Sequence, residues 1–165
     1  MKISPVTVFE KELEVLQTAL RENSDMIRQA FTAADVEENL RNGMMSAIFT
    51  IEGAAGFNFD PARLEELYKL GFRITSLGWN EKNVLTGSNV TGGGLTDMGR
   101  EYVKEAQRLG MIIDVSHISD EAFWVMSIMS QKPSSLRWLT STMKPSRWAS
   151  RRYSLPFSVR PPPVL

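Results

Sequence analysis

One stretch of this sequence places an amphipathic helix, a helix-ending glycine and a short apolar run in immediate succession. Thr96 or Asp97 can cap the helix, because either side chain can accept hydrogen bonds from the free N–H groups of the first turn. Gly110 follows the last apolar helical position, where a left-handed residue commonly ends a helix. The run at 111–115 has the length of a buried strand, and His117, the only histidine of the chain, follows it. The pattern predicts one helix–strand step of a parallel α/β protein.

Two further apolar runs of strand length, 44–51 and 72–77, precede this step. Between them, Asp60 and Pro61 form a good helix start, since aspartate caps the first turn and proline fits its first position. Gly71 marks the end of that helix. Strands that alternate with helices at this spacing favour a parallel sheet with right-handed crossovers.

Each of the three predicted strands is followed by side chains that could carry chemistry. Glu52 follows the first strand, Trp79 and Asn80 follow the second, and Ser116 and His117 follow the third. Residues at the carboxyl ends of parallel strands meet on one side of the sheet, where the sites of α/β proteins lie. A lone histidine is more often a hydrogen-bonded structural residue. Glu52 and His117 together form a plausible pair of metal ligands, but a zinc site usually takes three or four from the protein.

The remaining elements are predicted to be helices and one long loop. Residues 5–31 are expected to be helical in two pieces, because apolar side chains recur at helical spacing and Ser24 or Asp25 can cap the second piece. A short helix over 32–42 follows. The polar segment 81–94, rich in Gly and Asn, is expected to be a loop, and its length indicates a functional role.

With a last helix over 120–130, these elements place the chain in the α/β class. The parallel sheet could be open or part of a barrel. The 165 residues are fewer than the about 250 of a complete (β/α)8 barrel. If the sheet is a barrel, we expect only part of one.

Composition and motifs exclude several classes of protein. The chain has no cysteine, which rules out disulfide scaffolds and thiolate metal sites. No apolar run approaches the length of a membrane span or forms a signal-peptide core, so we expect a cytoplasmic protein with no membrane partner. Residues 94–101 have the glycine spacing of a P-loop but lack its Lys and Ser/Thr, and no G-x-S-x-G is present. Nucleotide binding and serine-nucleophile chemistry are therefore not expected.

The charges are distributed unevenly along the chain. All 19 acidic residues lie at or before Glu121, whereas the 44 residues after it carry seven basic residues and no acid. From Ser134 onward, repeated prolines break any long element. Basic residues interleaved with aromatic ones in this tail could form a nucleic-acid patch. Nothing else in the chain supports that interpretation, so no nucleic-acid partner is expected.

Five blocks of the sequence together resemble the renal, or membrane, dipeptidase family of zinc peptidases, and most closely its bacterial cytoplasmic members. The blocks lie in collinear order within residues 30–133. They are FTIEG at 49–53, LEELYKLGFR at 64–73, LGWN at 77–80, GLTDMG at 94–99 and LGMIIDVSHIS at 109–119.

The resemblance implies a (β/α)8 metallo-barrel with two zinc ions that hydrolyses dipeptides with a metal-activated water. Glu52 matches the carboxylate that bridges the two metals in the family, and His117 matches a histidine ligand of one of them. Trp79 stands where several members carry a substrate-binding histidine, so Trp79 and the neighbouring Asn80 are the expected substrate-binding residues. No residue is assigned a catalytic role.

Other motifs of the family have no counterpart in this chain. The family's His-x-Asp motif belongs on its first strand, but no histidine precedes His117. After Pro133 the family pattern calls for a strand, a Ser-His ligand and an Arg-Asn pair, and this chain reads Ser-Ser-Leu-Arg. We therefore expect residues 1–133 to be a partial metallo-dipeptidase barrel with an incomplete zinc ligand set and no activity as it stands.

Residues 134–165 form an atypical, basic tail rich in Ser, Arg, Pro and Trp. Loss of one nucleotide from codons for Pro-Ile-Ile-Ala-Ser, a natural continuation for the family, yields Pro-Ser-Ser-Leu followed by Arg. We hypothesise that the tail is a frameshifted reading. A family-like continuation in another frame of the DNA would support this, and an intact coding frame in independent isolates would contradict it.

Two other classes of function stay open at this level. One is a non-catalytic remnant or interaction module that binds a partner, such as a second copy of the chain, through an open sheet edge. The other is a different metal-dependent barrel hydrolase that acts on amides other than dipeptides. Metal binding, oligomeric state and a substrate panel would separate these classes.

Overall fold

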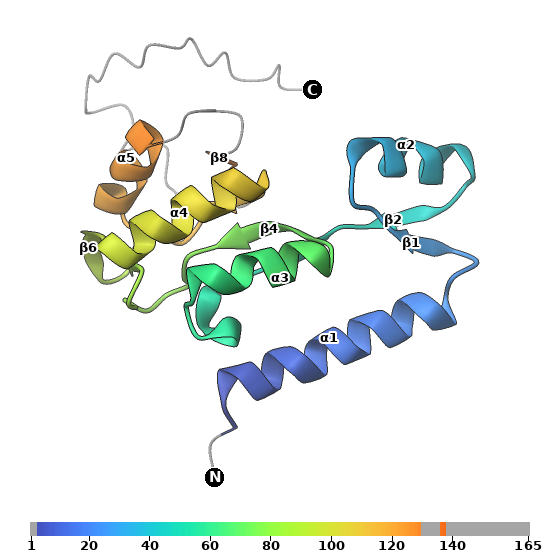
Figure 1. The fold of residues 1–165 in the computed structure, drawn as a ribbon, viewed down its shortest axis with the longest axis horizontal. Coiled ribbons are helices and arrows are strands. Elements are labelled where there is room, and N and C mark those ends of the chain that lie inside the picture. The colour runs from blue at the N-terminus through green and yellow to red at the C-terminus, as the bar shows by residue number, and fades with distance from the viewer. Residues whose placement is uncertain (1–2, 130–135, 138–165) are drawn as a thin grey trace.

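Four parallel strands form the main sheet of the computed structural model, which describes residues 3–129 and 136–137 (Figure 1). In spatial order they are β3 (Phe49–Ile51), β4 (Phe72–Ser76), β7 (Ile112–Asp114) and β8 (Leu136–Arg137). All three neighbouring pairs are parallel, and the spatial order follows the chain order. The predicted parallel α/β arrangement is therefore confirmed, and in the described part of the chain the sheet stays open.

The helices of the central region begin and end largely where their capping residues predict. These helices are η1 (Ala54–Phe57), η2 (Pro61–Arg63), α3 (Leu64–Lys69), α4 (Asp97–Leu109) and α5 (Asp120–Met129). Thr96 caps α4 by accepting a hydrogen bond of 3.0 Å from the N–H of Gly99. Gly110 ends α4 with a left-handed φ of 77°. Asp60 accepts a hydrogen bond from the N–H of Ala62 and so begins η2.

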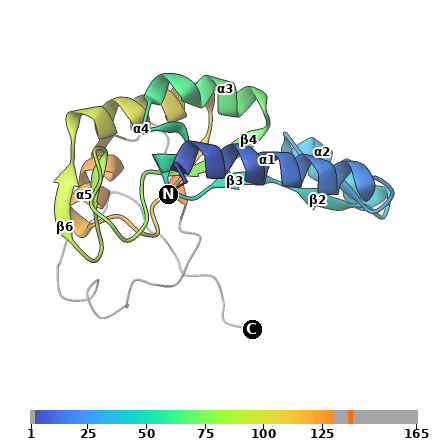
Figure 2. The same ribbon diagram turned by 90° about the horizontal axis from the view of Figure 1, so that it is seen from below.

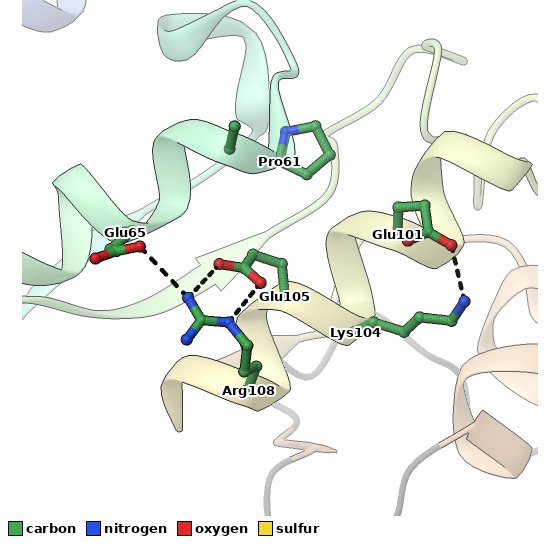
Figure 3. Close-up of a pocket in the computed structure, with 7 residues that line it drawn as sticks. Pro61, Glu65, Glu101, Lys104, Glu105 and Arg108 are labelled. Carbon is green, nitrogen blue, oxygen red and sulfur yellow. Dashed lines mark hydrogen bonds and ion pairs between the residues drawn. The ribbon is translucent and has the colours of Figure 1, made fainter.

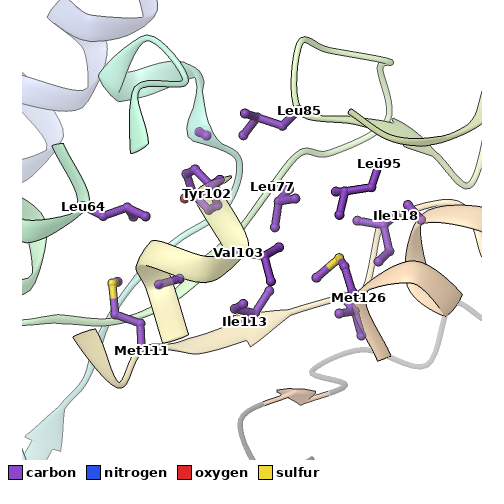
Figure 4. Packing of buried hydrophobic residues seen from close by; sticks show 14 of the residues in the cluster. Leu64, Leu77, Leu85, Leu95, Tyr102, Val103, Met111, Ile113, Ile118 and Met126 are labelled. Atoms are coloured by element: carbon purple, nitrogen blue, oxygen red, sulfur yellow. The ribbon is translucent and has the colours of Figure 1, made fainter. Parts of the chain in front are cut away.

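The apolar core lies between the main sheet and the helices that connect its strands (Figure 4). Tyr102 of α4 is fully buried, stacks on Phe57 with ring centroids 6.0 Å apart, and shares a hydrogen bond with the hydroxyl of Thr75. Burial raises the pKa of Tyr102, so this phenol stays neutral. Each fully buried side chain of this size contributes about 1.5–3 kcal/mol through burial. The labelled members of the cluster are Leu64, Leu77, Leu85, Leu95, Tyr102, Val103, Met111, Ile113, Ile118 and Met126.

The N-terminal region differs from its prediction at two points. It consists of α1 (Pro5–Glu22), β1 (Ile27–Gln29), α2 (Ala33–Arg41) and β2 (Met45–Ala47). The expected second helical piece of residues 5–31 is wrong, because residues 27–29 pair in parallel with β2 instead. The run at 44–51 is two strands rather than one, since β2 pairs with β1 and β3 pairs with β4.

The polar segment 81–94 is more ordered than the expected loop. It contains most of an antiparallel hairpin, β5 (Thr86–Ser88) and β6 (Gly92–Leu95). A Cβ atom on Gly87 would lie 2.0 Å from the carbonyl oxygen of Gly92, so only glycine permits this close approach. The hairpin was missed because glycines, rather than alternating apolar residues, form it.

The β1–α2–β2 unit lies to one side of the main sheet, as both ribbon views show (Figures 1 and 2). Polar and aromatic contacts attach it to the turn between α3 and β4. Gln29 donates a hydrogen bond to the carbonyl of Leu70. Arg73 donates to the carbonyl of Phe31 and lies over the rings of Phe31 and Tyr68. Apart from Leu136–Arg137, the predicted tail 134–165 lies outside the described residues.

Candidate metal centre

The carboxyl ends of β3, β4 and β7 bring the candidate residues to one side of the main sheet. Glu52 directly follows β3, Trp79 follows β4 by three residues, and His117 follows β7 by three residues. Because β4 separates β3 from β7, the side chains of Glu52 and His117 meet across the end of the middle strand.

Glu52 and His117 are in direct contact. Their Oε1 and Nε2 atoms lie 2.9 Å apart, and the side chains are 57% and 13% exposed respectively. The glutamate therefore faces solvent with part of its carboxylate, whereas the imidazole is largely enclosed. The other ring nitrogen of His117, Nδ1, is buried and has no hydrogen-bond partner among the described residues.

The two side chains fit the chemistry of a zinc site. Imidazole nitrogen and carboxylate oxygen are common zinc ligands, and two ligand atoms on one tetrahedral zinc lie about 3.3 Å apart when both bonds are about 2.0–2.1 Å. The observed separation of 2.9 Å is that of a direct hydrogen-bond contact, so the two atoms would move slightly apart to hold a zinc ion between them. A metal ion binds such groups as an ionised carboxylate and a neutral imidazole.

The ligand set is nevertheless small. In residues 3–129 and 136–137, no third His, Cys, Asp or Glu joins the pair. Asp114, at the end of β7, is engaged elsewhere, because its Oδ1 accepts hydrogen bonds of 3.0 and 2.5 Å from the N–H and hydroxyl of Ser116. Two ligands are fewer than the three or four that protein zinc sites usually supply.

Trp79 lies beside the pair, and Asn80 follows it on the surface. The indole ring of Trp79 meets the imidazole of His117 edge-on, with centroids 6.2 Å apart and planes at 81°. Trp79 is 53% exposed, which leaves much of its apolar ring open to solvent next to the pair. The backbone carbonyl of Asn80 accepts a hydrogen bond of 2.6 Å from Ser88, so the hairpin holds this strand exit.

Two buried serines near the pair were not identified from the sequence. Ser76 accepts a hydrogen bond from the N–H of Gly53, next to Glu52. Ser88 lies in the hairpin, and the following N–H, that of Asn89, donates to the carbonyl of His117. A serine at the end of an apolar run is the only sequence signal for Ser76, and nothing in the pattern marks Ser88.

The cavity of about 600 Å³ between η2, α3 and α4 is a separate feature, on the helices rather than at the strand ends (Figure 3). Its charged side chains are paired with one another. Arg108 donates to both carboxylate oxygens of Glu105 and lies 3.5 Å from Glu65, and Lys104 donates to Glu101. The hydrogen bond from Arg108 lowers the pKa of Glu105. None of the candidate ligands lines this cavity.

The fold and the pair define a class: an α/β protein with a glutamate and a histidine in contact at the carboxyl ends of parallel strands. Residues 3–143 match the membrane dipeptidase family, peptidase family M19, and the chain belongs to this family. The match extends beyond residues 30–133, which carry the resemblance in the sequence.

Individual relatives agree with this membership. The chain is 32% identical over 113 residues to dipeptidase verJ of Clonostachys rogersoniana, covering 66% of this chain and 29% of that protein. It is 31% identical over 128 residues to an uncharacterized protein from the pqqA 5′ region of Klebsiella pneumoniae, covering 73% and 47%. The chain thus spans less than half the length of these curated relatives.

A solved structure shows the same relationship. The metallopeptidase of Rhodobacter sphaeroides, liganded with a phosphinate mimic of the dipeptide L-Ala-D-Ala, superposes with a TM-score of 0.61 and 30% identity. The superposition covers 67% of this chain and 33% of that one. Within the described residues, no helix combines the length and apolar character that crossing a membrane requires.

Proposed function

We propose that Glu52 and His117 are metal ligands of a zinc-dependent dipeptidase site, which this chain carries only in part. The observation that carries the proposal is the contact of 2.9 Å between side chains from β3 and β7, two strands that are not neighbours in the sheet. These are the two residues that match metal ligands of the family. The dipeptide mimic in the Rhodobacter sphaeroides structure supports the same class of substrate.

The strand order supports a (β/α)8 barrel for the family fold of this chain. The strands β3, β4, β7 and β8 are parallel and follow one another in chain order, as the strands of a singly wound barrel do. In a doubly wound open sheet the strand order reverses at a switch point. No such reversal occurs along these four strands.

The residues have different roles in the proposed site. Glu52 and His117 would hold the metal together, with the carboxylate of Glu52 in direct reach of the imidazole. Bound zinc supplies a Lewis acid and an activated water for hydrolysis of a peptide bond. Trp79 offers an exposed apolar ring beside the ligands, and with Asn80 it is our candidate for contact with the dipeptide.

We also propose that the 165-residue chain alone does not hydrolyse dipeptides. Two ligands hold zinc weakly and leave a binuclear centre incomplete. The same observation favours a second candidate function, a non-catalytic chain that acts by binding a partner. A defined oligomer without bound metal would support that second function.

Zinc binding by the purified full-length chain tests the ligand assignment. We expect weak binding, measured by competition with a chromophoric chelator, and expect Glu52→Gln and His117→Ala to abolish it. Glu101→Gln, which removes a carboxylate of the helix cavity, is the matched control and should bind zinc as the unmodified chain does. Equal zinc binding by all four proteins would contradict the assignment.

A dipeptide hydrolysis assay with L-Ala-D-Ala tests the second statement. We expect no zinc-dependent turnover above that of the His117→Ala variant. Turnover that the unmodified chain shows and His117→Ala loses would contradict the proposed inactivity, and it would leave the ligand assignment standing.

A further inference from the structure

Two buried serines form hydrogen bonds to segments next to the strand ends that carry Glu52 and His117. We propose that Ser76 and Ser88 are positioning residues, which hold the backbone beside Glu52 and beside His117 so that the two side chains meet. The consequence for zinc binding rests on the proposed function, whereas the contact itself can be measured without metal.

Ser76 fixes the chain where it leaves β3. It is the last residue of β4 and only 1% exposed, and its Oγ accepts a hydrogen bond of 2.7 Å from the N–H of Gly53. The same hydroxyl donates to the carbonyl of Gly78 at 3.3 Å. Gly53 has a φ of 83°, so the chain turns away from the strand direction directly after Glu52. One side chain therefore connects the turn after Glu52 to the exit of the middle strand.

Ser88 fixes the other side of the site. It ends β5, is 1% exposed, and its Oγ donates to the carbonyl of Asn80 at 2.6 Å. Ser88 also forms an isolated antiparallel bridge with Ile118, and the N–H of Asn89 donates to the carbonyl of His117 at 3.0 Å. The hairpin thus binds the exit of β4 through Ser88 and the backbone of His117 through the next residue.

Both serine hydroxyls form hydrogen bonds to residues 76–80, the segment where the chain leaves the middle strand β4. Glu52 comes from one side of β4 and His117 from the other. Their separation therefore depends on how each flanking segment is attached to that exit. Ser76 makes the attachment for the glutamate side, and Ser88 makes it for the histidine side.

Thr75 provides a matched control within the same strand. It directly precedes Ser76, is equally buried, and its hydroxyl bonds the hydroxyl of Tyr102 in the core. Because neighbouring strand residues point to opposite faces, Thr75→Val removes a buried hydrogen bond without touching the site. A purely structural role of Ser76 would make the two substitutions equivalent.

The single histidine of the chain makes the contact measurable by NMR. We would record the two imidazole ¹⁵N shifts of His117 in the metal-free, full-length, tag-free protein, with Glu52→Ala as the reference for a lost contact. Ser76→Ala and Ser88→Ala should move these shifts toward the Glu52→Ala values, whereas Thr75→Val should leave them unchanged. In zinc titrations, each serine variant should bind about 10-fold more weakly, the scale of loss for a residue that orients a metal ligand.

Unchanged His117 shifts in the serine variants would overturn the proposal, and so would an equal movement in Thr75→Val. If one alanine variant does not fold, the other carries the test, because Ser76 and Ser88 lie in separate sheets. Ser88→Thr, which keeps a hydroxyl, should retain the shifts of the unmodified protein. Failure of the unmodified chain to bind zinc would contradict the proposed function alone, since the NMR comparison still decides the positioning roles.

Discussion

The central region and the N-terminal unit of this protein, which is the β1–α2–β2 unit, are stabilised in different ways. The central region, from β3 to α5, buries a continuous apolar cluster and carries every candidate site residue. In contrast, α2 buries only Asn39, whose side chain donates to Ser46. The comparison teaches that the site depends on apolar packing, whereas the β1–α2–β2 unit depends on its own strand pairing and on a few polar and aromatic attachments.

A pair of leucine truncations should show the largest difference between the two regions. Leu64→Ala, in the core beside α4, should lower the free energy of unfolding by about 2–5 kcal/mol because it removes fully buried methyl groups. Leu40→Ala, in α2, should change it by less than about 0.5 kcal/mol, since Leu40 is 76% exposed. Urea denaturation measures both. Equal losses would show that the N-terminal unit has a core of its own.

Gly71 lies at the junction between the regions, and Gly110, at the end of α4, provides a comparison away from it. Gly110→Ala should cost about 1–2 kcal/mol, the penalty of a left-handed backbone, because its Cβ would meet no atom within 4 Å. Gly71→Ala should cost more, since its Cβ would also lie 2.1 Å from the side-chain nitrogen of Gln29. Thermal or urea unfolding compares the two. A smaller loss for Gly71→Ala would contradict a close junction at this turn.

A conservative change at Arg73 should loosen the N-terminal unit and leave the core intact. Arg73→Lys loses the planar guanidinium that donates to the carbonyls of Phe31 and Tyr68, at an expected cost of about 1–3 kcal/mol. Hydrogen exchange should become faster in β1 and remain slow in β7. Arg41→Lys, on the exposed face of α2, is the control, and faster exchange in both strands would contradict a local attachment.

The smallest effect is expected at the charged cavity of Figure 3. The pKa of Glu105 is lowered by its hydrogen bond from Arg108, so ionised Glu105 favours the folded state above its ordinary pKa of 4.5. This stabilisation is lost as the pH falls through the lowered pKa. Arg108→Gln should therefore reduce the urea midpoint slightly near neutral pH, and progressively less as the pH falls below the ordinary pKa of 4.5. If the urea midpoints of the unmodified protein and Arg108→Gln differed more at acid pH than at neutral pH, this prediction would be wrong.

The helix ends and the meeting of the parallel strand ends were predictable, whereas the other long-range contacts were not. Thr96, Asp60 and Gly110 act within one helical turn, so their types and positions identify helix ends directly. The meeting of Glu52 and His117 follows from the rule that parallel strands end on one side of a sheet.

The missed elements depend on partners distant in the chain. Residues 27–29 form a strand because Met45–Ala47 lies alongside, which no local pattern shows. The hairpin depends on the absence of a side chain at Gly87, and the hydrogen bond of Ser76 joins segments 23 residues apart. Secondary-structure propensity and hydrophobic periodicity depend on neighbouring residues, so they do not reveal contacts between segments that are far apart in the chain.

The order of the main strands has a consequence for how the protein is made. Because β3, β4, β7 and β8 are neighbours in the order of the chain, each new strand can join the edge left by the previous one during translation. Each pairing still has to close the helix-containing segment between consecutive strands, and parallel pairings of this kind form slowly. At ribosomal rates of about 5–20 residues per second, the growing sheet exposes one fresh edge at a time, and chaperones on the nascent chain would meet that edge first.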